Sequence, residues 1–352
     1  MPSPALEGGK DMLRIKKCDL PKLYAAIAAK NDLFLPVKSA GKTNFAQWTE
    51  NAQVDIDTLK TVRSPKDAFF PQSENLYTCG KVDGKLCIEA EERCNAPFVV
   101  FGIRGCDVRG IAVLDKVFLS DPVDSYYAAR REHGILVSLA CGRPETSCFC
   151  GTFGIDCAEP EGDVVTWLAG EHLYWQSKTE KGEALTAQVA DLLESCEENA
   201  VEEAKASIRA ICEKLPLKSL DLSKWGADAA EKNFDSPIWE QLYAPCLACG
   251  TCTFVCPTCQ CYDIKDYDTG NGVQRYRCWD SCMYSDFTMM AHGNNRNSQM
   301  QRFRQRFMHK LAYFPANNQG MFSCVGCGRC VDKCPSHLNI VKVIKAFEKE
   351  GV

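Results

Sequence analysis

The sequence has no hydrophobic run long enough to cross a membrane, and residues 1–17 lack the apolar core of a secretory signal peptide. Its most apolar stretches, residues 97–103 and 134–141, have only the length of strands. The net charge of −5 comes without a polybasic segment, which argues against a nucleic-acid partner. We therefore expect a cytoplasmic protein without a transmembrane segment.

Several motifs that bind nucleotides or zinc are also missing. No G-x-G-x-x-G motif follows a strand, and the sequence contains neither a phosphate-binding P-loop nor an H-E-x-x-H motif. The five histidines are scattered and suggest no catalytic triad. These absences predict that the chain itself binds neither flavin nor nicotinamide.

Cysteine, by contrast, is abundant, with 23 among the 352 residues. Disulfide-rich proteins with so much cysteine are typically short secreted chains. This chain is long enough for two or three domains and has no secretory features. The cysteines are therefore expected to hold metal in a reducing compartment.

The most diagnostic cysteines form one motif, C-x2-C-x2-C-x3-C-P, which occurs twice. The two copies are Cys246, Cys249, Cys252, Cys256 and Pro257, and Cys324, Cys327, Cys330, Cys334 and Pro335. This motif is typical of bacterial ferredoxins with two [4Fe–4S] clusters, in which the fourth cysteine ligates the other cluster. Zinc is the alternative, but zinc sites usually use two separated pairs of ligands.

The exchange of the fourth cysteine predicts the ligands of two clusters. Site A would consist of Cys246, Cys249, Cys252 and Cys334, and site B of Cys324, Cys327, Cys330 and Cys256. Gly250 and Gly328 occupy matching positions, where a side chain would crowd the cluster loop. Residues 236–352 contain 13 Lys and Arg against 9 Asp and Glu, a positive balance that suits anionic clusters.

Cys256, the last cysteine of the first motif, is separated from Cys324 by 67 residues, too many for a minimal two-cluster ferredoxin. Residues 296–314 carry an apolar stripe at helical spacing, formed by Met300, Phe303, Phe307, Leu311 and Phe314. Arg302, Arg306 and Lys310 occupy another face, which is either a solvated face or serves to offset the charge of the clusters or to dock an acidic partner. Because a second helix is expected over residues 337–349, this region predicts an α-helical ferredoxin.

Four further cysteines lie between the motifs: Cys259, Cys261, Cys278 and Cys282. Their spacing allows another metal centre, whereas the alternative is a set of buried thiols that line the cluster domain. The absence of a Cys-Cys doublet argues against the non-cubane clusters of heterodisulfide-reductase catalytic subunits. More iron than the roughly twelve atoms expected for three cubanes would indicate metal at these cysteines.

The upstream region predicts strands over residues 85–90, 98–103 and 134–140 and a helix over residues 107–118. Cys106 and Cys141 each follow one of these strands, and Cys148 and Cys150 lie in the next loop. Since strand ends and a loop can converge on one edge of a sheet, these four cysteines predict a third [4Fe–4S] cluster, here called site C.

Zinc and unligated thiols are the alternatives at site C. Substitute ligands for this site would be Cys157, Cys87 and Cys94. The cysteines without neighbours at ligand spacing are Cys18, Cys79, Cys196 and Cys212, and we expect them to be inert.

The expected fold class is α+β, with an α/β-like N-terminal domain followed by an α-helical dicluster ferredoxin domain. Four segments are expected: a disordered tail over residues 1–11, the α/β domain with site C over 12–180, a helical connector over 181–235, and the ferredoxin domain with sites A and B over 236–352. A helix is also expected over residues 20–30.

The chain resembles a family of iron–sulfur subunits found in anaerobic sulfite reductase and, as the β subunit, in sulfhydrogenase, a cytoplasmic NiFe hydrogenase. The resemblance covers nearly the whole chain after Met12, and its carriers are residues 66–72, 102–107, 124–131, 141, 146–150, 246–261, 279–282 and 304–307. Gly105 stands where this family usually has proline. Cys278 is not a position that we expect the family to share, which disfavours a fourth cluster.

The resemblance implies an electron-transfer subunit of an anaerobic oxidoreductase complex. It would take electrons from a flavoprotein subunit that binds FAD and NAD(P)H and pass them to a catalytic redox subunit, such as a hydrogenase, a sulfite reductase or a heterodisulfide-reductase-like enzyme. Two alternatives are a zinc-dependent scaffold and a catalytic iron–sulfur subunit with a substrate-converting centre at Cys259, Cys261, Cys278 and Cys282. The sequence leaves the terminal electron acceptor and the direction of electron flow open.

Overall fold

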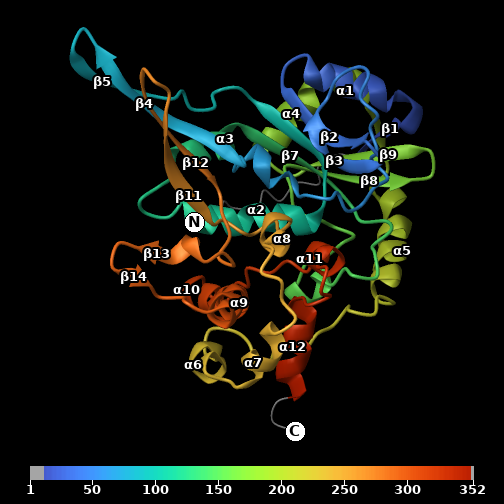
Figure 1. Cartoon of the computed structure of the whole chain (residues 1–352). Helices are drawn as coiled ribbons and strands as arrows, with labels where there is room; N and C mark the ends of the chain where they lie inside the picture. The colour runs from blue at the N-terminus through green and yellow to red at the C-terminus, as the bar shows by residue number, and fades with distance from the viewer. Residues whose placement is uncertain (1–11, 350–352) are drawn as a thin grey trace.

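The computed structural model describes residues 12–349, so the tail predicted over residues 1–11 lies outside the described residues. Its main feature is an eight-stranded mixed sheet (Figure 1). From edge to edge, the strands are β10 (Glu194–Cys196), β1 (Met12–Lys16), β9 (His172–Ser177), β8 (Val164–Ala169), β7 (Gly134–Leu139), β6 (Phe98–Ile103), β2 (Asp32–Ser39) and β3 (Lys42–Gln47). Strands β2, β6, β7 and β8 pair in parallel, which confirms an α/β-like N-terminal region.

Helices cover both faces of this sheet, and therefore its central strands are mostly apolar, with Ser138 in β7 and Thr166 in β8 as buried polar exceptions. The covering helices are α1 (Leu20–Ala28), α4 (Glu180–Gln188), α2 (Gly105–Phe118) and α3 (Ser125–His133). In β6, Val99 and Phe101 pack with α1 and α4, whereas Phe98 and Val100 pack with α2 and α3. The predicted strands at residues 98–103 and 134–140 and the helices at 20–30 and 107–118 are confirmed to within two residues.

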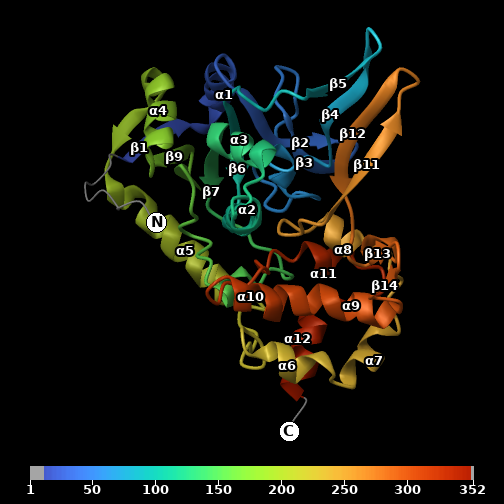
Figure 2. The same ribbon diagram turned by 90° about the vertical axis from the view of Figure 1, so that its left-hand side faces the viewer.

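A second, four-stranded sheet joins the two halves of the sequence. Its order is β11 (Tyr262–Asp268), β12 (Gly272–Trp279), β4 (Ser73–Val82) and β5 (Lys85–Ala90). The two hairpins project together from the body of the molecule in both views (Figures 1 and 2). The prediction of an all-helical ferredoxin domain is therefore wrong, because the segment between the cysteine motifs contributes a hairpin that pairs with an N-terminal strand.

The C-terminal part packs helices around an aromatic core at the end of the molecule away from the large sheet (Figure 2). The helices are α6 (Ala229–Phe234), α7 (Ile238–Tyr243), α8 (Thr251–Phe254), α9 (Gln299–Met308), the π-helical turn η7 (His309–Tyr313), α10 (Phe314–Asn317), α11 (Arg329–Lys333) and α12 (Ile340–Lys349). Helix α9 begins with a capping box between Ser298 and Gln301. The predicted apolar stripe is confirmed, since Phe303, Phe307 and Leu311 are buried.

The segment predicted as a helical connector does not form a separate unit. Helix α4 packs on the large sheet, β10 extends its edge, and α5 (Glu202–Cys212) lies against β8. Helix α6 instead packs against α9. The physical reason is that each piece carries its own apolar residues, such as Leu185 in α4 and Trp225 before α6, and buries them in the nearer core.

The remaining elements are short. They are the 3-10 helices η1 (Lys17–Asp19), η2 (Pro65–Ala68), η3 (Cys150–Phe153), η4 (Ala190–Leu192), η5 (Glu198–Val201) and η6 (Asp286–Thr288), and the strands β13 (Met289–Met290) and β14 (Gly293–Asn294). Between residues 12 and 349, no helix combines the length and the apolar character that a membrane crossing requires.

Candidate metal centres

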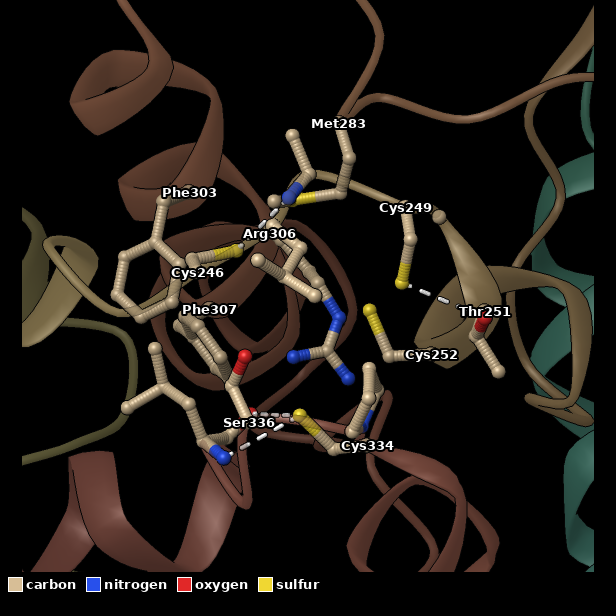
Figure 3. Close-up of a pocket in the computed structure, with 15 residues that line it drawn as sticks. Cys246, Cys249, Thr251, Cys252, Met283, Phe303, Arg306, Phe307, Cys334 and Ser336 are labelled. Atoms are coloured by element: carbon tan, nitrogen blue, oxygen red, sulfur yellow. Dashed lines mark hydrogen bonds between the residues drawn. The ribbon is translucent and has the colours of Figure 1, made fainter.

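The four cysteines predicted for site A line one pocket (Figure 3). Cys246 and Cys249 lie in the loop before α8, Cys252 lies within α8, and Cys334 follows α11. Apolar side chains also line the pocket, among them Met283, Phe303 and Phe307. The pocket therefore joins Cys334 of the second motif to three cysteines of the first.

Hydrogen bonds to sulfur hold the thiols of site A. The backbone N–H of Leu338 donates to Cys334 Sγ at 3.2 Å, and that of Ala248 donates to Cys246 Sγ at 3.4 Å. Hydrogen bonding with the side chain and backbone of Thr251 lowers the pKa of Cys249. The lowered pKa favours the thiolate of Cys249, which is the form that binds metal.

Gly250 and Gly328 both adopt positive φ angles, of 72° and 76°. A Cβ atom at Gly250 would lie 2.5 Å from the hydroxyl of Tyr284, and one at Gly328 would lie 2.5 Å from the carbonyl oxygen of Ser147. The expected crowding at these positions is thus present, but it comes from neighbouring protein atoms.

Arg306, in the predicted basic stripe, points toward cysteines and is only 3% exposed. Its guanidinium reaches in between Cys252 and Cys334 (Figure 3), and its Nε has no hydrogen-bond partner among the described residues. Burial lowers the pKa of Arg306, but the negative charges of the Cys252 and Cys330 thiolates outweigh this effect and raise it above its ordinary value. A buried cation with an unused donor fits an anionic cluster. The interpretation of this stripe as a solvated face is therefore wrong.

The four cysteines predicted for site B also lie close together. Burial, followed by the charges of Cys330 and Cys256, raises the pKa of Cys324, and burial raises that of Cys327 to about 12. Cys256 likewise raises the pKa of Cys330. Thiols buried in this way stay protonated unless a metal or a cation stabilises the thiolate.

Lys310 supplies such a cation beside site B. It is 4% exposed, and its Nζ donates to the hydroxyl of Thr258 at 2.6 Å. Burial lowers the pKa of Lys310, but the thiolates of Cys256 and Cys259 outweigh burial and raise it. The lysine therefore remains charged and can offset negative charge on the site.

Site C is built at the carboxyl ends of two neighbouring parallel strands, where open α/β sheets commonly bind ligands. Cys106 lies in the first turn of α2 after β6, and Cys141 follows β7. Both interact electrostatically with Cys150, as does Cys148 from the loop between Cys141 and η3. The structure therefore brings the four predicted cysteines together.

Two further cysteines lie beside site C. Cys157 Sγ is 3.2 Å from Cys150 Sγ, and Cys157 is hydrogen-bonded to Cys212 on α5. The sequence suggested Cys157 as a substitute ligand but missed Cys212. Cys212 lies far along the chain from the site C cysteines and has no other cysteine at ligand spacing. The other suggested substitutes lie elsewhere, with Cys87 in β5 and Cys94 in the loop before β6.

Sites B and C are in direct contact through their loops. The backbone N–H of Phe149 donates to the carbonyl oxygen of Gly326 at 2.8 Å. Lys60, which is mostly buried, forms ion pairs with Glu145 at 2.8 Å and with Asp332. These contacts connect residues on either side of the junction between the sheet and the helical part.

The four cysteines between the motifs do not form one group. Cys259 is hydrogen-bonded to Cys256, and Cys261 to Cys282. The hydrogen bond from Cys282, with the charges of Lys310 and Lys66, lowers the pKa of Cys261 to about 7. Cys278 lies in β12 and interacts with Lys265 and Asp263 instead, which argues against a centre that uses all four thiols.

The spacing of the thiols bears on the choice between zinc and iron–sulfur clusters. Within residues 12–349, no three His, Cys, Asp or Glu side chains converge closely enough to hold a single metal ion. The thiols of site A surround a pocket instead. Zinc requires four ligands around one point, so this arrangement fits a larger, multi-metal cluster better.

Comparison with known proteins supports the same chemistry. The 4Fe-4S dicluster domain family matches residues 245–338, which include both cysteine motifs and the hairpin between them. Over 343 residues, the chain is 31% identical to sulfhydrogenase 2 subunit beta from Pyrococcus furiosus, and the alignment covers 94% of this chain and 96% of that protein. The chain therefore belongs to the family of iron–sulfur proteins that includes the sulfhydrogenase beta subunit.

Proposed function

We propose that this chain is the electron-transfer subunit of a multi-subunit oxidoreductase and that it holds three [4Fe–4S] clusters, one each at sites A, B and C. The ligands would be the twelve cysteines that define these sites. A cluster bound at each site would accept and release one electron at a time. The protein would contribute the thiolates, the burial and the nearby positive charges that set how readily each site is reduced.

The observation that carries this proposal is the contact between successive sites. Cys252 of site A interacts electrostatically with Cys330 of site B. Cys106 of site C interacts with Cys327 of site B. Site B therefore lies between the other two, and the three sites extend from the helical part to the edge of the large sheet. Electron transfer between two ends of one subunit requires such a series.

We infer two different protein partners, one at each end of the series. Residues 1–235 contain 28 Lys and Arg against 37 Asp and Glu, whereas residues 236–352 have the opposite balance. The acidic surface of residues 1–235 suits a different partner from the near-neutral surface of residues 236–352, where Arg277, Arg306, Lys310 and Arg329 are buried. One partner would be a flavoprotein that binds FAD and NAD(P)H, and the other a catalytic redox subunit. The name of the Pyrococcus furiosus relative, a subunit of a sulfhydrogenase, supports assembly into a complex.

Electron transfer from NAD(P)H to a viologen dye tests this proposal. The chain, loaded with clusters under anaerobic conditions, should contain about twelve iron atoms and oxidise no NAD(P)H by itself. Addition of the flavoprotein subunit that co-purifies with it should restore NAD(P)H oxidation. Flavin binding and NAD(P)H oxidation by the isolated chain would overturn the relay function.

Cysteine variants locate the path within the reconstituted complex. Cys106→Ser and Cys327→Ser should interrupt transfer to the catalytic subunit while the flavin is still reduced by NAD(P)H. Cys278→Ser is the matched control, because its thiol lies in β12 and away from the three sites. Unchanged transfer in Cys327→Ser, with its iron content lowered, would contradict a path through site B.

A further inference from the structure

A separate cleft of about 390 Å³ opens between residues of α2, the β11–β12 hairpin and α9. Two cysteines line it, Cys261 before β11 and Cys282 after β12. Other side chains around the cleft include Phe118, Arg296, Gln305 and His309. The electron-transfer function proposed above makes no use of these two thiols or of the cleft.

The base of the β11–β12 hairpin holds the two cysteines together. Tyr262 pairs with Trp279 in the sheet, and the N–H of Asp280 donates to the carbonyl oxygen of Cys261 at 2.9 Å. Ser281, which is fully buried, accepts a hydrogen bond from Thr253 at 2.9 Å and fixes the turn that leads to Cys282. Both thiols consequently line the same cleft, and each changes the pKa of the other.

The pair is adjacent to site B but is not part of it. Cys259 lies between this pair and site B, because it interacts both with Cys256 of site B and with Cys261 and Cys282. Lys66 is 3% exposed, donates to the carbonyl oxygen of Cys259 at 2.7 Å and fixes this segment. Cys259 interacts with Cys256, and Cys278 faces Lys265 and Asp263. Cys261 and Cys282 therefore remain as a pair.

We propose that Cys261 and Cys282 form a redox-active dithiol that reduces a small disulfide carrying an anionic group. The anionic group is inferred from Arg296, which lines the cleft and forms no ion pair with any residue from 12 to 349, whereas Asp124, the carboxylate that also lines the cleft, is paired with Arg277. The aromatic ring of Phe118 provides an apolar wall for the carbon skeleton of the substrate. This proposal rests on the electron-transfer function, because site B would be the source of electrons.

The reaction consists of two exchanges and one regeneration step. The thiolate of Cys261, the more exposed of the two, attacks one sulfur of the substrate disulfide and releases the other half as a thiolate. Cys282 then attacks Cys261 Sγ in the mixed disulfide, which releases the second half and leaves a Cys261–Cys282 disulfide. A cluster held at site B would supply, one at a time, the two electrons that, with two protons, restore the thiols of Cys261 and Cys282.

Mass spectrometry of the cluster-loaded full chain tests the proposal without an activity assay. After anaerobic incubation with 3,3′-dithiodipropionate and alkylation of free thiols, a peptide pair linked through Cys261 and Cys282 is expected, with two thiols released per chain. The neutral bis(2-hydroxyethyl) disulfide should react about tenfold more slowly, and Arg296→Met should remove that preference. Equal rates for both disulfides with the unmodified chain would refute the anionic specificity.

Matched variants and iron content separate this proposal from its alternatives. Cys261→Ser and Cys282→Ser should lose the linked peptide and keep all their iron, and Cys278→Ser should retain both. A loss of about four iron atoms in Cys261→Ser would instead identify a fourth cluster and overturn the dithiol. A chain with full iron but no linked peptide would refute the dithiol alone, whereas a chain without iron would refute the electron-transfer function.

Discussion

Arg329 and Asp107 form a bidentate ion pair at the junction between the helical part and the large sheet. Nη1 of Arg329 lies 2.6 Å from Oδ1 of Asp107, Nη2 lies 2.7 Å from Oδ2, and both side chains are 2% exposed. Arg329 is located between Cys327 and Cys330 of site B, and Asp107 follows Cys106 of site C. The pair therefore positions the ligand loops of two sites with respect to each other.

Asp107→Asn is expected to destabilise the folded chain by about 3–5 kcal/mol, because it leaves the Arg329 guanidinium buried without a counter-charge. It should also lower the iron content, since sites B and C both depend on this junction. Anaerobic denaturant titration followed by circular dichroism measures the first effect, and an iron assay measures the second.

Glu161→Gln is the matched control for this prediction. Arg109 lies on the same helix as Asp107, and its Nη2 is 2.7 Å from Oε1 of Glu161. The Glu161 side chain, however, is 62% exposed. Exposed ion pairs contribute less than about 1 kcal/mol. Equal loss of stability in the two variants would show that the buried pair has no special role.

Arg306→Met is expected to lower the reduction potentials of the clusters at sites A and B. A cation beside Cys252 and Cys330 favours the reduced, more negative cluster, so its removal makes reduction harder. For unit charges a few ångström apart in a partly polar interior, the shift is on the order of 100 mV. Redox titration monitored by electron paramagnetic resonance measures the change.

Arg304→Met separates this effect from a general effect of helix α9. The Arg304 guanidinium lies 3.6 Å from the ring of Phe234 and donates to the Phe234 carbonyl oxygen at 2.8 Å, so it is directed away from the cysteines. Its removal should leave the potentials nearly unchanged. If both variants shift the potentials equally, the direct charge effect of Arg306 is ruled out.

Cys334→Ser tests the exchange of the fourth cysteines. Because Cys334 lines the site A pocket, the variant should lose the same paramagnetic signal as Cys246→Ser. It should keep the signal that Cys324→Ser removes. Should Cys334→Ser and Cys324→Ser instead lose one common signal, each motif would bind its own cluster with all four cysteines.

The parts of the fold that were predictable from sequence have strong local patterns. Strands β6 and β7 are continuous apolar runs because both of their faces are covered, and the cysteines that follow them share an edge because the strands are parallel. The apolar spacing in α9 likewise indicated a helix with one buried face. The strand pattern predicted site C, and the repeated cysteine motif predicted sites A and B.

The β11–β12 hairpin was not predictable because its residues give little evidence of burial. Ile264 and Tyr267 are 49% and 62% exposed, and charged residues alternate with them. The hairpin is stabilised by pairing with β4, which lies nearly two hundred residues earlier in the sequence. Long-range pairing of this kind leaves no periodic pattern in a single sequence.

The burial of two cations could not be decided from the sequence for a similar reason. The sequence left open whether Arg306 is solvated or offsets the charge of the clusters, and Arg329 looks like an ordinary surface residue; the burial of both depends on partners from other segments. Arg329 is compensated by Asp107, more than two hundred residues away. Only the folded arrangement shows that these cations face the cysteine sites.

Gly328→Ala should destabilise the junction between sites B and C by more than backbone strain alone. Gly328 has a φ of 76°, and a Cβ atom there would lie 2.5 Å from the carbonyl oxygen of Ser147 in the site C loop. Gly320 has a φ of 82° but nothing within 4 Å of its Cβ position, so Gly320→Ala reports the strain by itself, about 1–2 kcal/mol. Denaturant titration of both variants should therefore show the larger loss for Gly328→Ala, accompanied by a loss of iron that Gly320→Ala does not share. Equal losses of stability, with iron retained in both variants, would mean that the site C loop can move aside, and that close contact between the two loops is not needed to hold the clusters.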